Sequence, residues 1–401
     1  MTNVSLYLTE SADMYPGAPA LRCDGATTTH SELADQAARL AAYLAERSVQ
    51  PGDRVGVMLP SRPEFAAVFY GVLHAGAVVV PMNPWQSARE VAFYLTNTGA
   101  RMLFFAPACA DVAVAGARAA GAAPVEVDGH TLEHLMADVA GSPRPATRGA
   151  DDTAVILHTC GTTGVPKGAQ LTHRNLVTNQ AVTARSLLDL GPDDVVLGCL
   201  PLFEAFGMTC GLLAAISTGA TLAVLPRFAP DKALEMFAAE GVTVFQGAPF
   251  MYAAMLGAAP YHALDFGSLR VCISGGAAMP MDVLRRFEDR FGCTVLEGYG
   301  LAETSPAACF NHPGAVRKSG SVGTPIDGVQ MRVVDERGTE VPAGTLGEIQ
   351  IRGHNVMKGY WNLPRATAAA IIDGWFATGD AGRVDEDGYF FIVNRKQTPF
   401  G

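Results

Sequence analysis

Short apolar runs that alternate with stretches of helical spacing constrain the fold of this chain more than any other feature. In the first third of the sequence these runs are Val55–Leu59, Val78–Val80 and Met102–Phe105. Uninterrupted apolar runs of this kind are typical of strands buried on both faces, and helical stretches between them are typical of crossovers between parallel strands. The sequence therefore predicts an α/β fold.

The stretch Ser31–Arg47 is the clearest helix in this part of the chain. Thr29 and Glu32 have the spacing of a capping box, in which each side chain caps the backbone of the other. Apolar residues then recur on one face at Leu33, Ala37, Leu40 and Leu44. This spacing predicts an amphipathic helix with one buried face.

A connector separates the first apolar runs from a second series. Gly121–Asp152 mixes Ala, Gly, Pro and Asp around a short amphipathic piece at Leu132–Val139. Beyond it, further apolar runs predict buried strands joined by helical stretches, at Ala154–Leu157, Val195–Leu200, Thr221–Leu225, Val242–Phe245 and Arg270–Ser274. Continued alternation of this kind predicts a second α/β unit.

Towards the end of the chain, apolar residues alternate one by one with polar residues. Val329–Val334 and Glu348–Arg352 have this period-two pattern and flank the turn-rich Asp335–Thr345, which indicates half-exposed strands. We therefore expect a first α/β subdomain at residues 1–150, a second at 151–321, and a small β-rich subdomain, a distorted barrel, at 322–401.

Charge and hydropathy exclude several classes of function. The formal net charge of -10 leaves no dense basic stripe for binding nucleic-acid phosphates. Met1–Asp13 carries no basic stretch followed by an apolar core, so we expect no secretory signal and a cytoplasmic protein. The uncharged run Met208–Leu225 approaches membrane-spanning length, but turn-forming Gly, Ser and Thr interrupt it. A buried helix followed by a strand is therefore expected there, with no stable membrane insertion.

A loop rich in glycine and threonine follows the predicted strand Ala154–Leu157. It runs from His158 to Gly168 with the sequence HTCGTTGVPKG. Glycines let backbone N–H groups approach phosphate oxygens, threonines add hydroxyl donors, and Lys167 adds a positive charge. It is not a Walker A loop, because Gly168 and not Ser or Thr follows the lysine. Such loops are also common as tight turns, so a nucleotide role requires a second motif.

The segment Glu297–Thr304 supplies that second motif. Its sequence EGYGLAET places a tyrosine ring, carboxylates and a hydroxyl on a stretch hinged by glycines. An aromatic ring can stack on a base, a carboxylate can hold Mg²⁺, and a hydroxyl can contact a phosphate. The loop and this segment together predict a nucleotide site.

With these motifs the sequence resembles the adenylate-forming superfamily of acyl-CoA synthetases, firefly-type luciferases and peptide-synthetase adenylation domains. The resemblance covers nearly the whole chain and rests on motifs in a fixed order, namely Thr159–Gly168, Ser274–Ala278, Gly298–Thr304, Thr378–Asp380 and Arg395. It implies an enzyme that joins a carboxylic acid to AMP with loss of pyrophosphate. In the acyl-CoA synthetase branch, the acyl group then passes to coenzyme A.

The resemblance implies a nucleotide site with defined roles. The stretch from Gly276 to Ala278 would border the adenine, Tyr299 would pack against it, and Asp380 and Arg395 would contact the ribose. The implied contacts to ATP or AMP are together Thr159, Gly161, Gly164, Gly276, Ala277, Ala278, Glu297, Gly298, Tyr299, Gly300, Asp380 and Arg395.

The implied catalytic residues act on the phosphates. Thr162, Thr163 and Lys167 would hold the departing pyrophosphate, Glu303 matches the Mg²⁺ position, and Thr304 would contact the α-phosphate. A substrate carboxylate is already ionised at neutral pH, so no general base is required. The protein would chiefly position the reactants and stabilise charge.

The resemblance also implies an acyl pocket of apolar and small residues. Such a lining suits a fatty, aryl or bulky terpenoid-like acid. The residues expected to line it are Phe203, Glu204, Gly207, Gly211, Gly247, Met251, Gly275 and Gly300.

Two residues depart from the pattern of the family. The eight cysteines are dispersed and are expected to be reduced thiols, but Cys160 replaces a serine of the phosphate loop. It leaves a weaker donor there, and a redox-sensing role is an alternative. Glu204 replaces the histidine usual in acyl-CoA synthetases. Peptide-synthetase domains commonly have an aspartate at that position, which pairs with a substrate amine, so recognition of an amino acid is an alternative role of Glu204.

Members of the superfamily continue past the position of Arg395 into a mobile C-terminal domain, which brings a lysine to adenylation and helps to build the thiol tunnel. We expect this domain to be absent here. Loss of one oriented cation costs on the order of 10² to 10³ in rate, by analogy with an oxyanion donor. Slow adenylation and still weaker thioester formation are therefore expected.

The expected function is activation of a hydrophobic carboxylic acid, with ATP, Mg²⁺ and coenzyme A as the small molecules required. Two alternatives stay open. One is an amino-acid-activating domain that serves a carrier protein, and the other is a catalytically weak nucleotide-binding relative.

Overall fold

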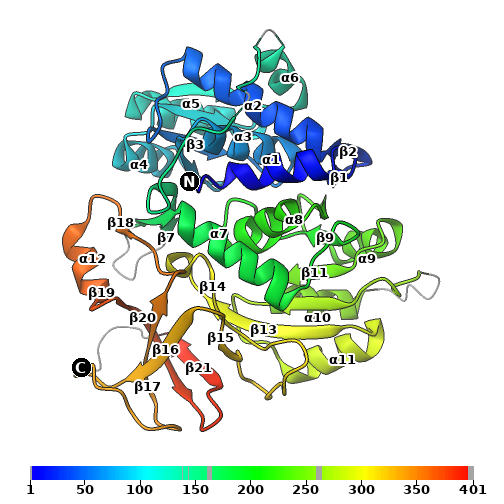
Figure 1. The fold of residues 1–401 in the computed structure, drawn as a ribbon, viewed down its shortest axis with the longest axis vertical. Coiled ribbons are helices and arrows are strands. Elements are labelled where there is room, and N and C mark those ends of the chain that lie inside the picture. The colour runs from blue at the N-terminus through cyan, green and yellow to red at the C-terminus, as the bar shows by residue number, and fades with distance from the viewer. Residues whose placement is uncertain (1, 138, 143, 160–164, 259–263, 396–401) are drawn as a thin grey trace.

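Three β-sheets organise the chain in the computed structural model of the protein (Figure 1). The structure describes residues 2–137, 139–142, 144–159, 165–258 and 264–395. Two large sheets with their helices occupy the upper and middle parts of Figure 1, and a smaller antiparallel sheet lies at the lower left. The predicted α/β class with an additional β-rich part is confirmed.

The first sheet has seven strands in the order β18-β8-β7-β4-β3-β5-β6. The strands from β7 to β6 pair in parallel, and β8 and β18 extend the sheet antiparallel at one edge. The predicted strand Met102–Phe105 is confirmed as β5, with all its residues buried. The other strands are β3 (Arg54–Met58), β4 (Val78–Pro81), β6 (Ala123–Glu126), β7 (Thr153–Thr159), β8 (Lys167–Thr172) and β18 (Gly359–Tyr360).

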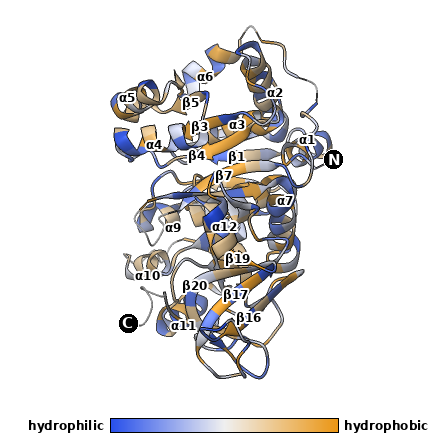
Figure 2. Ribbon diagram, turned by 90° about the vertical axis from the view of Figure 1, so that its left-hand side faces the viewer, coloured by the Kyte–Doolittle hydropathy of each residue, from blue (hydrophilic) through white to orange (hydrophobic). Residues whose placement is uncertain are grey.

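The helix α2 (His30–Glu46) confirms the predicted amphipathic helix. The Thr29 hydroxyl accepts a hydrogen bond from the Glu32 N–H at 3.2 Å, and the Glu32 carboxylate accepts one from the Thr29 N–H at 2.7 Å. Other helices of this part are α3 (Pro63–His74), α4 (Ala88–Thr98), α5 (Ala110–Ala120) and α6 (Gly129–Met136). Figure 2 shows hydrophobic strands β3 and β4 beside helices of mixed hydropathy, as expected for a sheet buried beneath amphipathic helices.

The second sheet has nine strands in the order β15-β14-β13-β12-β11-β9-β10-β1-β2. The central strands from β13 to β1 pair in parallel. The strands are β1 (Pro19–Cys23), β2 (Ala26–Thr29), β9 (Val195–Gly198), β10 (Thr221–Val224), β11 (Val244–Gly247), β12 (Val271–Ser274), β13 (Thr294–Gly300), β14 (Ala307–Phe310) and β15 (Thr324–Pro325). The helices α7 (His173–Ala181), α9 (Pro230–Ala239), α10 (Pro249–Gly257) and α11 (Met281–Phe291) belong to this part. Helix α1 (Ser5–Met14) packs against α2 and α3 of the first part and against the helix that precedes β10.

Strand β11 begins later than the apolar run Val242–Phe245 indicates. The N–H of Val242 bonds to the carbonyl of Phe237 in α9 at 3.1 Å, after Gly241 has turned the chain with a φ of 63°. Val242 therefore closes the end of the helix and does not start the strand.

The uncharged run Met208–Leu225 forms helix and strand, as predicted. A π-helical segment at Phe206–Leu213 continues into α8 (Ala214–Ser217), and β10 follows. Among the described residues, no helix combines the length and the apolar character needed to cross a membrane.

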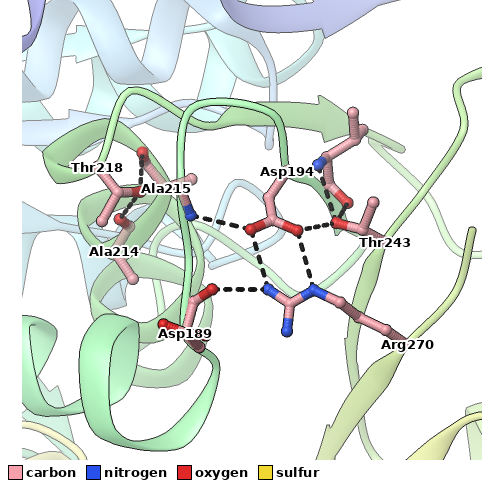
Figure 3. Close-up of polar contacts among 9 residues, drawn as sticks. Asp189, Asp194, Ala214, Ala215, Thr218, Thr243 and Arg270 are labelled. Carbon is pink, nitrogen blue, oxygen red and sulfur yellow. Dashed lines mark hydrogen bonds and ion pairs between the residues drawn. The ribbon is translucent and has the colours of Figure 1, made fainter.

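A polar clamp joins the amino ends of three neighbouring strands of the nine-stranded sheet (Figure 3). The guanidinium of Arg270 donates to both carboxylate oxygens of Asp194, at 3.1 and 2.9 Å, and the Thr243 hydroxyl donates to the same carboxylate at 2.6 Å. These residues directly precede β12, β9 and β11. The clamp therefore fixes the three strands at their amino ends, away from the edge of the sheet formed by their carboxyl ends.

The third sheet is antiparallel and contains β16 (Val329–Val334), β17 (Gly347–Gly353), β19 (Ile371–Ile372), β20 (Trp375–Val384) and β21 (Phe390–Arg395), with α12 (Pro364–Ala370) before β19. The predicted strand Val329–Val334 is confirmed as β16. The three sheets exchange strands along the chain, because β1 and β2 join the second sheet and β18 joins the first. The divisions at residues 150 and 321 remain a proposal about folding units.

Candidate active site

Two adjoining cavities lie at the carboxyl ends of β12 and β13, where ligands commonly bind in parallel α/β sheets. The larger cavity has a volume of about 590 Å³ and the smaller about 410 Å³. They share a wall made of Gly276, Gly298, Tyr299, Gly300, Leu301 and Ala302. A ligand in one cavity would therefore meet a ligand in the other along this wall.

The larger cavity collects most of the residues predicted to contact ATP. Its further lining includes Thr159, Ala277, Ala278, Met279, Glu297, Glu303, Gly320, Val322, Asp380, Ile392 and Val393. The predicted contacts came from motifs far apart in the sequence, and the fold brings them together because β7, β12, β13 and β20 all end or pass here. Their contact with a nucleotide stays a prediction.

Tyr299 and Asp380 face each other across the boundary between the second and third sheets. The Tyr299 hydroxyl donates to Oδ2 of Asp380 at 2.6 Å, and the Asp380 N–H donates to the Thr378 hydroxyl at 3.0 Å. In the β20–β21 ladder, Asp380 pairs with Arg395. The two residues predicted to contact the ribose thus lie opposite each other in register.

Glu303 is a buried carboxylate held by two hydroxyl groups. Its Oε1 accepts hydrogen bonds from the Thr159 hydroxyl at 3.2 Å and from the Tyr360 hydroxyl at 3.0 Å. Within the described ranges it forms no ion pair, although its residue is only 8% exposed. A buried carboxylate without a cation is costly, so this arrangement is suited to a bound cation.

Lys167 opens β8, directly after the phosphate loop. Its ammonium lies 5.2 Å from the centre of the Tyr360 ring, within the range of a cation–π contact. The strand pairing of β7 with β8 places Lys167 opposite Thr159. The lysine and Glu303 are therefore connected through the same tyrosine. The loop residues Cys160, Gly161, Thr162, Thr163 and Gly164 lie outside the described residues.

The Thr304 hydroxyl is occupied within its own turn. It donates to the Pro306 carbonyl at 2.6 Å, accepts from the Leu301 N–H at 2.8 Å, and is fully buried. Thr304 lines neither cavity. In this structure the short turn after β13 uses the hydroxyl to satisfy its own backbone, and the contact of Thr304 with the α-phosphate stays a prediction.

Glu297 lies under the larger cavity near the predicted adenine position. Burial raises the pKa of this carboxyl to about 7, and a hydrogen bond from the Met279 backbone offsets the rise only in part. The residue is 7% exposed. The carboxyl therefore changes its protonation state close to neutral pH.

The smaller cavity is mostly apolar and contains one carboxylate, Glu204. Four of the residues predicted for the acyl pocket line it, Phe203, Glu204, Gly275 and Gly300, and their contact with an acyl group stays a prediction. The Glu204 side chain is exposed to the cavity, yet protein surrounds it closely enough that burial raises its pKa. No Lys or Arg lines this cavity within the described part of the chain. An acid that binds here would therefore meet an uncompensated negative charge whenever Glu204 is ionised.

Four residues expected to line the acyl pocket line neither cavity: Gly207, Gly211, Gly247 and Met251. At Gly207 an added Cβ would lie 2.3 Å from the Pro201 carbonyl oxygen, so this glycine is required by a close backbone approach. Met251 is buried in the protein interior, with its sulfur 3.8 Å from that of Cys199. Their contact with an acyl group stays a prediction.

The first sheet contributes a wall that the sequence motifs do not indicate. Asn83, Gln86, Tyr94 and His158 all line the smaller cavity. The rings of Tyr94 and His158 stack at 3.9 Å, and burial lowers the pKa of His158 to about 4. His158 is thus neutral at pH 7. The one feature of the sequence that could have indicated this wall is the position of His158, directly before the phosphate loop.

Comparisons with known proteins agree with this geometry. The family described as AMP-binding enzyme matches residues 8–361. The chain is 37% identical to a feruloyl-CoA synthase from an Amycolatopsis species, covering 96% of this chain and 77% of that protein. It is 33% identical to a long-chain-fatty-acid–CoA ligase from Bacillus subtilis strain 168, covering 97% and 76%. The crystal structure of ATP-bound MatB from Rhodopseudomonas palustris matches with a TM-score of 0.92 at 32% identity, covering 98% of this chain and 79% of that chain.

Proposed function

The chain belongs to the AMP-binding enzyme family, and from this premise we propose that it activates a hydrophobic carboxylic acid with ATP. The products are an acyl-adenylate and pyrophosphate, and the acyl group is then transferred to coenzyme A. The relatives named as feruloyl-CoA synthase and long-chain-fatty-acid–CoA ligase support an acid-thiol ligase. An aryl or fatty acid is the proposed substrate class.

One observation carries this proposal. The cavity that holds Tyr299, Glu303 and Asp380 adjoins the mostly apolar cavity across the strip Gly298–Ala302. At Gly300 an added Cβ would lie 1.8 Å from the Pro306 carbonyl oxygen, so the strip stays thin. A nucleotide on one side and an acid on the other would bring the carboxylate against the α-phosphate.

The chemistry requires position and charge more than proton transfer. The substrate carboxylate attacks the α-phosphorus, the bond to the pyrophosphate oxygen breaks, and the negative charge moves onto the departing pyrophosphate. Lys167 would neutralise that charge, and Tyr299 and Asp380 would hold the nucleoside. No side chain needs to remove a proton in this step.

The residues also fit a Mg²⁺ ion, which commonly binds through one or two carboxylates together with substrate phosphates. Glu303 supplies a buried carboxylate that lacks an ion pair within the described ranges. When bound, Mg²⁺ would screen the phosphate charges. Glu303 would hold the ion, and Thr159 would orient that carboxylate.

Glu204 favours a second candidate function, the activation of an acid that carries an amine for delivery to a carrier protein. Its carboxylate forms no ion pair within the described ranges and lines the cavity proposed for the acyl group. An ammonium group on the substrate would neutralise this charge. Dependence of the reaction on a substrate amine separates the two candidates.

Exchange of labelled pyrophosphate into ATP tests the proposal. We expect exchange that requires both an acid and Mg²⁺, and we expect Lys167→Ala to reduce it by about 10² to 10³, as for loss of one oriented charge donor. Exchange that is independent of added acid would contradict the proposed function.

A further inference from the structure

Tyr360 stands between two charged groups to which the proposed chemistry assigns separate tasks. Its hydroxyl donates to Oε1 of Glu303 at 3.0 Å, and its ring centre lies 5.2 Å from the ammonium of Lys167. The residue is 9% exposed, so bulk water does not compete strongly for either contact. One buried side chain therefore contacts both a carboxylate and a cation of the candidate site.

The backbone around Tyr360 is fixed by the strand that carries Lys167. Tyr360 pairs with Ala169 in the β18–β8 ladder, and the N–H of Trp361 donates to the carbonyl of Gly168 at 2.7 Å. On the other side, the N–H of Met357 donates to the carbonyl of Glu303 at 2.8 Å. The segment around β18 thus braces the base of the phosphate loop against the turn that bears Glu303.

The two hydrogen bonds to Glu303 are asymmetric. Thr159 and Tyr360 both donate to Oε1, and within the described residues no donor binds Oε2. Two donors on one oxygen fix the orientation of the carboxylate and leave the other oxygen available to a cation. Groups that orient a metal ligand in this way commonly change metal affinity when they are removed.

We propose that Tyr360 is a positioning residue with two separable tasks: its hydroxyl orients Glu303 for Mg²⁺, and its ring holds Lys167 at the triphosphate. This inference rests on the proposed function, because it assumes that ATP and Mg²⁺ bind in the larger cavity. Packing alone does not require the hydroxyl, since a phenylalanine would keep the ring and the backbone brace.

Calorimetric titration with ATP, in EDTA and in saturating Mg²⁺, separates the two tasks without relying on turnover. Tyr360→Phe keeps the ring and loses the hydroxyl. We expect its ATP affinity in EDTA to equal that of the wild type, and the gain in affinity from Mg²⁺ to fall by about tenfold, as for loss of a group that orients a metal ligand. Tyr360→Leu loses the ring as well, and its affinity in EDTA should also fall, by about threefold, as for loss of a cation–π contact.

Tyr252→Phe is the matched control, because it removes a buried tyrosine hydroxyl in α10 that donates at 2.8 Å to the Ile273 carbonyl in β12 of the nine-stranded sheet. We expect Tyr252→Phe to lose about as much thermal stability as Tyr360→Phe does. Its affinity for ATP should still rise with Mg²⁺ as much as that of the wild type. The inference is overturned if Tyr360→Phe keeps the full Mg²⁺ effect, or if Tyr252→Phe loses it equally. A wild-type protein that binds no ATP in Mg²⁺ would instead contradict the proposed function itself.

Discussion

The hydroxyl of Tyr299 donates a 2.6 Å hydrogen bond to the carboxylate of Asp380, which links a strand of the nine-stranded sheet to a strand of the five-stranded sheet. Both residues line the larger cavity. The relationship places the aromatic ring of Tyr299 beside the carboxylate that we propose as the acceptor for ribose hydroxyls. It is the arrangement expected if this cavity binds a nucleoside.

Substitution of Asp380 should therefore weaken ATP binding. Asp380→Ala removes a charged hydrogen-bond acceptor worth about 1.5 to 3 kcal/mol, so we expect Kd for ATP to rise by about 10- to 100-fold. Tyr299→Phe keeps the ring and removes only a hydrogen bond within the protein, not one to ATP, so it should raise Kd by less than about threefold. Calorimetry measures both. An Asp380→Ala protein that binds ATP like the wild type would place the ribose elsewhere.

Glu204 should make the preference for the acid depend on pH. Burial raises the pKa of Glu204, so the fraction of neutral Glu204 grows as pH falls. KM for an apolar acid should then fall in the wild type as pH is lowered from 8 towards the pKa of Glu204. Glu204→Gln removes the charge, and we expect a KM for that acid that is several-fold lower at pH 8, roughly the effect of removing one nearby like charge. In Glu204→Gln, KM for the apolar acid should no longer depend on pH in this range.

The same substitution, Glu204→Gln, distinguishes the two candidate functions when each acid is compared with its amino derivative. If the substrate carries an amine, Glu204→Gln should raise KM for the amino acid and leave its amine-free analogue unchanged or improved. Steady-state exchange rates with an aryl acid and its amino derivative give this comparison. Equal responses of both acids to the substitution would remove Glu204 from substrate recognition.

Glu297 should lower the stability of the protein as pH rises. The pKa of this carboxyl is raised from its ordinary 4.5 to about 7. A raised carboxyl pKa gives a contribution that is fully present below pH 4.5 and is lost as pH rises through 7. The loss is up to about 3 kcal/mol. Glu297→Gln cannot ionise, so urea unfolding at pH 5.5 and pH 8 should show a smaller difference than in the wild type; an unchanged difference would contradict this assignment.

The clamp of Asp194 and Arg270 in Figure 3 should contribute to stability without affecting the site. Asp194→Ala leaves the guanidinium and the Thr243 hydroxyl without this acceptor, which should cost about 2 kcal/mol in the free energy of unfolding. Asp35→Ala removes an exposed ion pair with Arg39 and should cost less than about 0.5 kcal/mol. Kd for ATP should be unchanged in both variants. Equal stabilities of the two variants would refute the role of the clamp.

The elements predicted best from the sequence are those with a local signal. The run Met102–Phe105 and the capping box at Thr29 and Glu32 correspond to β5 and to the start of α2, because short-range periodicity and capping report burial and helix ends directly. The apolar run Val242–Phe245 misplaced the start of β11, since apolar character does not distinguish a strand from the end of a preceding helix.

The parts that could not be predicted depend on contacts between distant segments. Nothing in the local sequence places Tyr360 against Glu303, because β18 joins the first sheet only through its pairing with β8. Asn83 and Gln86 line the smaller cavity but lie far in the sequence from the motifs that predicted the acyl pocket.

Thr304 shows that a local motif can also be insufficient. A motif identifies the residue, but its hydroxyl is engaged by the turn around it.

Mass spectrometry of the protein incubated with ATP, Mg²⁺ and a panel of fatty, aryl, terpenoid and amino acids tests the proposed adenylation most directly. We expect that an acyl-adenylate forms with one hydrophobic class of acid, that EDTA abolishes it, and that Lys167→Ala lowers its amount strongly. Bound ATP without an acyl-adenylate from any acid of the panel would contradict the claim that the two adjoining cavities bring an acid to the α-phosphate.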